Sequence, residues 1–281
     1  MATVVPVSPA GSGIEVQLVR DGTGGLPPDA LFASADPAER DAALGEPLDE
    51  LGRIPLSYDC LLLRSGSTTA LVDGGLGDVV HPFGSDAGHL LEALGGVGIE
   101  PADVDVVIVT HAHLDHVGGL VRDGRPVFGR ATHLVPRAER AFWQSDSELQ
   151  AGAPVSVRVA RGAFAALEAA GLLHDLEPGD RVLDGVVALP APGHTPGQIA
   201  LRIGDAAGGV LHVADAFVHP LHVEHPTWTM HADALPAEVV ATRGALCALA
   251  ARERLVVTAS HVWGPGTIDE TVDGFRFRRA P

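Results

Sequence analysis

Short apolar runs separated by glycine, proline and aspartate recur along the whole chain. Some runs alternate apolar with polar residues, as in half-buried strands, and others are continuous, as in strands buried on both faces. This pattern predicts strands at residues 14–19, 58–64, 68–73, 104–109, 132–135, 186–189, 199–203, 210–213 and 255–258. Residues 21–25 (Asp-Gly-Thr-Gly-Gly) are typical of a turn.

Helical periodicity lies between these strands. It predicts helices at residues 90–97, 137–144, 159–170 and 236–251. Pro236 suits the first turn of its helix, and Gly171 is a typical stop signal. Because strands and helices occur in both halves, we expect an α+β protein in which two sheets form a sandwich with helices outside.

Residues 26–56 do not fit this regular pattern. They are rich in proline, alanine and aspartate, with only weak helical fragments. A segment of this length is long for a connection in a compact domain. We expect either a lid, an arm that contacts a partner in a homodimer, or a plain surface excursion.

Composition and charge narrow the class of protein. With 281 residues, of which 46% are hydrophobic, the chain can form one domain over residues 1–281. A formal charge of −17 without a basic run argues against nucleic-acid binding. The N-terminus lacks the features of a signal peptide, and the apolar runs are too short to cross a membrane. We therefore expect a cytoplasmic protein, with Cys60 and Cys247 as buried thiols.

The most informative chemistry follows the strand at 104–109. His111, His113, Asp115 and His116 fall within six positions. Alternation along an extended segment points His111 and His113 the same way. Asp115 is expected to cap the helix that begins there. Imidazole and carboxylate groups together suit zinc and other first-row metals.

Three further polar residues follow predicted strands in the same manner. His194 lies in a turn after 186–189, Asp215 follows 210–213, and His261 follows 255–258. Since converging strand ends would bring these side chains to one rim, they are candidate partners of the first cluster.

With these motifs the chain resembles the metallo-β-lactamase superfamily, whose αββα sandwich carries its ligands on such loops. The resemblance implies that one metal is held by His111, His113 and His194. It implies that Asp115, His116 and His261 hold a second and that Asp215 bridges the two, while Asp73 lies buried beneath the site. Two divalent ions are implied, zinc first, with manganese, iron or cobalt as alternatives. They would share a hydroxide that attacks the substrate, and a proton-shuttling role for Asp115 is a further hypothesis.

The segments around these motifs resemble the branch that holds N-acyl homoserine lactonases and methyl parathion hydrolase. Among them are Val19–Thr23, Leu71–Gly75 and Pro226–Trp228. The resemblance implies a hydrolase for a small lactone, ester or phosphotriester. Homoserine lactonases use a tyrosine near the metals. Here the one tyrosine, Tyr58, begins a strand of the first half and is not expected in that role.

Substrate contacts are expected from the histidines that follow Asp215. His219 and His222 lie in a segment, residues 217–231, that we expect to overhang the metals. Two other functions stay open. One is a thioesterase or cyclase of secondary metabolism on the same site, and the other is a metal-stabilised binding protein without turnover.

Overall fold

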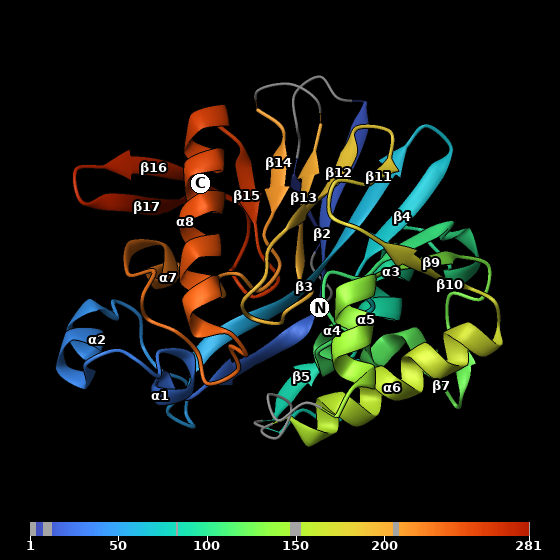
Figure 1. Ribbon diagram of the computed structural model, residues 1–281, viewed down its shortest axis with the longest axis horizontal. Coiled ribbons are helices and arrows are strands. Elements are labelled where there is room, and N and C mark those ends of the chain that lie inside the picture. Colours follow the sequence, from blue (N-terminus) through green and yellow to red (C-terminus); the bar gives the residue numbers. More distant parts are fainter. Residues whose placement is uncertain (1–3, 8–12, 83, 147–152, 205–207, 281) are drawn as a thin grey trace.

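The computed structural model describes residues 4–7, 13–82, 84–146, 153–204 and 208–280. Its centre is formed by two β-sheets that face each other, with helices on the outer side of each (Figure 1). This is the αββα sandwich and the α+β class expected from the sequence. No helix within the described residues is long and apolar enough to cross a membrane.

The first sheet is mixed. Its order is β1-β2-β3-β4-β6-β9-β10, antiparallel as far as β4 and parallel beyond it, with β5 paired to β2. Its strands are β1 (Val4–Val7), β2 (Ile14–Leu26), β3 (Ile54–Ser65), β4 (Thr68–Val72), β5 (Ser85–Ala87), β6 (Val106–Ile108), β9 (Thr132–Pro136) and β10 (Leu173–Leu176).

The second sheet runs β11 to β17 in sequence order, and only β14 and β15 are parallel. Its strands are β11 (Arg181–Leu183), β12 (Val186–Pro190), β13 (Ile199–Ile203), β14 (Val210–His212), β15 (Val256–Thr258), β16 (Gly266–Thr271) and β17 (Gly274–Arg279). A separate small hairpin joins β7 (Val121–Arg122) to β8 (Arg125–Pro126).

The longer helices cover the outer faces of the sheets, and short helices lie in the loops around one end (Figure 1). They are α1 (Pro28–Leu31), α2 (Pro37–Ala43), α3 (Leu90–Gly96), α4 (Leu114–Val117), α5 (Arg137–Gln144), α6 (Pro154–Ala169), α7 (Leu221–Glu224) and α8 (Pro236–Glu253), with 3-10 turns at Pro101–Asp103 and Gly118–Leu120.

Strand β3 shows why its sequence is apolar without alternation. Leu61 and Leu63 face the second sheet, whereas Cys60 and Leu62 face the cluster that contains helices α3 and α6. On the other side of the sandwich, Cys247 of α8 packs against the outer face of the second sheet. A strand buried on both faces needs apolar residues at every position, and both cysteines are free, buried thiols, as expected.

The predicted turn at residues 21–25 is wrong. This segment continues β2, which pairs with β3 as far as Leu26 through a β-bulge between Arg20 and Gly22. Gly22 is explained by β5, which lies on the other edge. A Cβ on Gly22 would lie 2.1 Å from the carbonyl oxygen of Asp86. Close backbone approach, not chain reversal, is therefore the reason for glycine here.

Residues 26–56 fold back over the loops of the second half. The segment contains α1 and α2 and then enters β3. Leu31 and Phe32 pack with Val218, Trp228 and Met230 in one buried cluster. The segment thus forms a wall beside the 217–231 loop, and its role as a lid or a dimer arm stays a prediction.

Candidate metal centre

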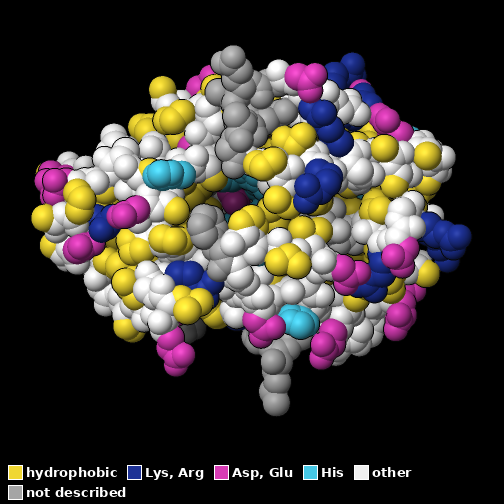
Figure 2. All heavy atoms as spheres, turned by 90° about the horizontal axis from the view of Figure 1, so that it is seen from below, with side chains coloured by type: hydrophobic (Ala, Val, Ile, Leu, Met, Phe, Trp, Pro, Cys, Tyr) yellow, Lys and Arg dark blue, Asp and Glu magenta, His cyan; other side chains and the backbone are white. Residues whose placement is uncertain are grey.

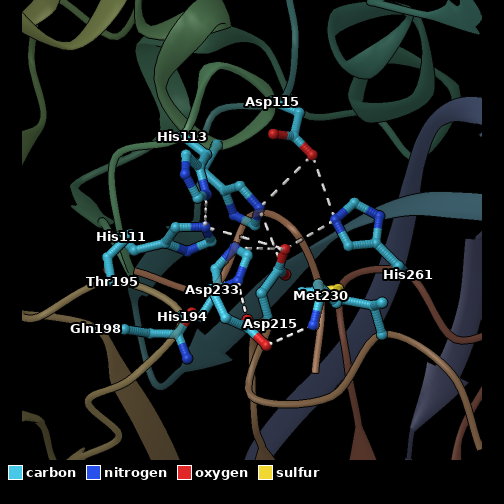
Figure 3. Close-up of polar contacts among 12 residues, drawn as sticks. His111, His113, Asp115, His194, Thr195, Gln198, Asp215, Met230, Asp233 and His261 are labelled. Atoms are coloured by element: carbon cyan, nitrogen blue, oxygen red, sulfur yellow. Dashed lines mark hydrogen bonds and ion pairs between the residues drawn. The ribbon is translucent and has the colours of Figure 1, made fainter. Parts of the chain in front are cut away.

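The predicted metal ligands come together at one edge of the sandwich, where four strands end. His111–His116 follow β6, His194 follows β12, Asp215 follows β14 and His261 follows β15. Figure 3 shows their side chains pointing toward a common centre. Strand ends from both sheets supply the cluster, so the whole sandwich fixes its geometry.

Asp215 lies in the middle of this cluster. Its carboxylate oxygens are 3.1 Å from Nε2 of His261, 3.5 Å from Nε2 of His116, 3.6 Å from Nε2 of His194 and 3.9 Å from Nε2 of His111. Nδ1 of His113 lies 3.1 Å from Nε2 of His111. This central position is the one that a bridging carboxylate requires.

Partners outside the cluster orient the imidazoles. Three histidines donate a hydrogen bond from Nδ1–H. His116 donates to Asp73 at 2.8 Å, and His194 donates to Asp233 at 2.9 Å. His261 donates to the Ser57 carbonyl at 2.8 Å. A proton on Nδ1 leaves the lone pair of Nε2 facing inward, which is the usual state of a metal-ligating histidine. Asp73 lies beneath the site, as expected, and also accepts from the backbone and hydroxyl of Thr110.

The inward atoms fit divalent metal ions. Nε2 of His116, Nε2 of His194 and Oδ1 of Asp215 are buried without any hydrogen-bond partner, a costly arrangement unless a cation lies between them. Three groups of ligand atoms lie within 4.8 Å of one another: His111–His113–His194, His111–His116–Asp215 and Asp115–His116–His261. Nitrogen with carboxylate oxygen is a donor set for zinc and its first-row relatives.

The pKa values of two histidines in the cluster shift in opposite directions. Burial and the neighbouring His194 lower the pKa of His113 to about 3. Although burial lowers the pKa of His261, the carboxylates of Asp215 and Asp115 outweigh it and raise the value to about 10. The site thus carries buried negative charge on the side of Asp115 and Asp215, which favours a bound cation.

Asp115 does not cap its helix. His113 is the N-cap residue of α4 and makes no capping hydrogen bond through its side chain. The Asp115 carboxylate instead lies 3.2 Å from Nε2 of His261 and 3.7 Å from Nε2 of His116. The capping prediction is wrong because the side chain turns inward to the histidines.

The cluster lies at the bottom of a pocket of about 610 Å³. Figure 2 shows histidine and acidic side chains in a hollow with hydrophobic side chains around it. Its lining includes Leu26, Leu56, Val218 and Met230, which pack in one hydrophobic cluster, and Trp143, which belongs to another. Among the described residues that line the pocket, none is a lysine or arginine.

His219 and His222 do not reach this pocket. His219 forms a 2.7 Å contact with Glu46, and Nε2 of His222 donates to the Leu31 carbonyl at 3.1 Å. Both rings pack edge-on against Phe32. These side chains join the 26–56 wall to the 217–231 loop, so the geometry gives them a structural role in place of the expected substrate contact.

Tyr58 and His81 line the pocket, and sequence reasoning missed both. The Tyr58 ring packs edge-on against His261, and its hydroxyl lies 3.5 Å from Nε2 of His81. The sequence did not lead us to expect Tyr58 in a lactonase-type role, and its position beside His261 follows from β3, which carries it to the same end of the sandwich. Its signal in the sequence was weak, since a single tyrosine at a strand start is usually a packing residue.

Comparison with known proteins agrees with this geometry. Residues 53–261 match the model of the metallo-beta-lactamase superfamily. The N-acyl homoserine lactonase AttM of Agrobacterium fabrum is 38% identical over 69 residues, which cover 25% of this chain and 24% of AttM. Matches to curated relatives cover 22–61% of their own length.

Solved structures show the same fold over the full chain. The hydrolase AbOPH superposes with a TM-score of 0.88 at 23% identity, covering 100% of this chain and 98% of AbOPH. The dizinc quorum-quenching lactonase AidC gives 0.86 at 21% identity, with coverage of 100% and 98%. With the family match over 53–261, which spans more than half of its length, the chain belongs to the metallo-beta-lactamase superfamily.

Proposed function

We propose that this protein is a dinuclear zinc hydrolase that cleaves an uncharged or weakly charged lactone, ester or phosphotriester. The observation that carries the proposal is the cluster of inward-facing imidazoles around Asp215 at the bottom of a largely apolar pocket. Similarity to AttM and AidC, which are lactonases, supports a lactone as the substrate among these three classes.

One ion would be held by His111, His113 and His194. The other would be held by Asp115, His116 and His261, and Asp215 would bind both ions. Bound zinc supplies a Lewis acid for the substrate oxygen and lowers the pKa of a water molecule toward neutrality. The protein contributes the pocket that surrounds the metals and the substrate. The absence of lysine and arginine among the described lining residues disfavours substrates with a free carboxylate or phosphate.

Tyr58 adds a hydrogen-bond donor at the edge of the site. Burial, then the charges of Asp115 and Asp215, raise its pKa, so the hydroxyl keeps its proton. We propose that this hydroxyl donates to an oxygen of the substrate. The apolar walls would hold the groups on either side of the reacting bond and keep bulk water out.

The test combines a metal count with kinetics. Purified protein is analysed for zinc, manganese, iron and cobalt and assayed on lactones, aryl esters, phosphotriesters and thioesters. We expect about two metals per chain, and His113→Ala should lower kcat/KM more than about 100-fold because it removes a ligand. His174→Ala, an exposed histidine of β10, is the matched control.

Two results would contradict the proposal. One is equally slow turnover of every substrate by the wild type and His113→Ala. The other is turnover of thioesters alone, which would indicate the thioesterase or cyclase alternative.

A further inference from the structure

Asp233 stands directly behind one of the proposed ligands. Its Oδ1 accepts the Nδ1–H of His194 at 2.9 Å, and its Oδ2 accepts the backbone N–H of Met230 at 2.8 Å. Residues 230–234 also line the pocket. One carboxylate therefore serves both the ligand and the pocket wall, as Figure 3 shows.

Backbone hydrogen bonds join the same two parts. The N–H of Ala234 donates to the His194 carbonyl at 3.0 Å, and that of Leu235 donates to the Gly193 carbonyl at 2.8 Å. A displacement of the wall would therefore move the His194 turn as well as its carboxylate partner.

Arg243 of α8 lies beneath this arrangement and is fully buried. Its guanidinium donates to the carbonyls of Ala216, Pro226 and Trp228 at 2.6, 3.1 and 2.8 Å. Its Nη2 has no hydrogen-bond partner and lies 3.6 Å from Oδ2 of Asp233. A buried cation requires a nearby carboxylate, and Asp233 supplies it.

We propose that Arg243 and Asp233 form a positioning pair that couples metal affinity at the His111–His113–His194 group to the order of the pocket wall at residues 226–234. The inference rests on the proposed metal site. His194 would be a stronger Nδ1–H donor to Asp233 with a metal on its Nε2, and a carboxylate held in place in this way would restrict the movement of Met230, whose N–H it accepts. Coupling is reciprocal, so ordering of the wall by a substrate should tighten metal binding by the same factor.

The first measurement is zinc affinity by competition with a chromophoric chelator. Asp233→Asn leaves a single acceptor oxygen for two donors, and Arg243→Met removes the charge while keeping an apolar stem. Each should weaken one class of zinc site about 10–100-fold, with partial recovery in Arg243→Lys. Arg202→Met is the matched control, because Arg202 of β13 pairs with Glu253 at the end of α8 and contacts none of the proposed ligands.

The second measurement is hydrogen exchange of residues 226–234 with and without zinc. In the wild type, zinc should slow exchange at the amides of Met230 and Ala234 at least several-fold. In Asp233→Asn this difference should shrink. A role in packing alone would alter exchange equally in both states.

The outcomes separate the two proposals. If the wild type binds no zinc, the proposed function and this inference both fail. If it binds zinc, but both variants bind it equally well or zinc leaves exchange at 226–234 unchanged, the inference alone is overturned. Should Arg243→Met fail to fold, Asp233→Asn decides the result.

Discussion

Tyr58 gives the pocket a hydroxyl donor that is separate from the proposed metal ligands. Its ring packs against His261, and its hydroxyl lies 3.5 Å from His81. Tyr58→Phe keeps the ring and removes the hydroxyl. We expect kcat to fall about 10–100-fold while the zinc content stays the same, since the hydroxyl would stabilise developing charge on the substrate oxygen. Steady-state kinetics with metal analysis checks this, and an unchanged kcat would exclude the contact.

His133 of β9 should make the fold sensitive to acid. Burial lowers its pKa to about 4, whereas the unfolded chain has a histidine pKa of about 6.5. The unfolded state therefore takes up the proton first as the pH falls. The contribution of His133 to the free energy of unfolding is complete above pH 6.5 and lost toward pH 4, with about 2 kcal/mol lost by pH 5.

The measurement is urea unfolding of the metal-free protein from pH 8 to pH 4.5. His133→Gln should remove about one proton from the pH dependence of stability between pH 6.5 and 4.5. His174→Gln, on the neighbouring strand but exposed, should leave the slope unchanged. Parallel profiles for His133→Gln and the wild type would show that His133 does not titrate on unfolding.

At the scale of elements, the sequence predicted where strands occur better than how far each strand extends. Apolar runs located the strands that precede His111, His194, Asp215 and His261, because both faces of each strand are covered. They did not predict that residues 21–25 extend β2, since pairing with β5 is a tertiary contact that glycine composition does not encode. The inward turn of Asp115 and the position of Tyr58 are likewise set by contacts with a residue far along the chain, His261.

The turn that carries His194 depends on contact with α8. Gly193 has φ +135°, and a Cβ there would lie 2.2 Å from the backbone nitrogen of Val239. Gly193→Ala would force the helix and the turn apart. We expect about 2–5 kcal/mol of destabilisation, from an unfavourable φ together with overpacking, and weaker zinc binding.

Gly171→Ala is the control for this prediction. It also has a positive φ, +69°, but no atom lies within 4 Å of its added Cβ. It should cost about 1–2 kcal/mol and leave zinc affinity intact. Equal effects of the two substitutions, measured by urea unfolding and chelator competition, would show that the contact with Val239 does not position His194.

At the scale of the whole molecule, the site lies where the two sheets meet. The first sheet supplies the His111–His116 loop and Asp73, and the second supplies His194, Asp215 and His261. Ligands from both sheets mean that a bound metal would cross-link the halves of the sandwich. Metal binding should therefore stabilise the entire fold and not the loops alone.

Removal of metal should consequently lower the melting temperature. Without a cation, the carboxylate of Asp215 and the unpartnered nitrogens of His116 and His194 stay buried together, beside the partly buried carboxylate of Asp115, at an energetic cost. Zinc at about 1,000 times its dissociation constant adds about 4 kcal/mol of stability, which corresponds to about 10 °C for a protein of this size. Calorimetry of chelated protein, before and after zinc is restored, measures the difference. Calcium prefers all-oxygen sites and should not substitute for zinc. Equal melting temperatures with chelator, calcium and zinc would contradict a metal that joins the two sheets.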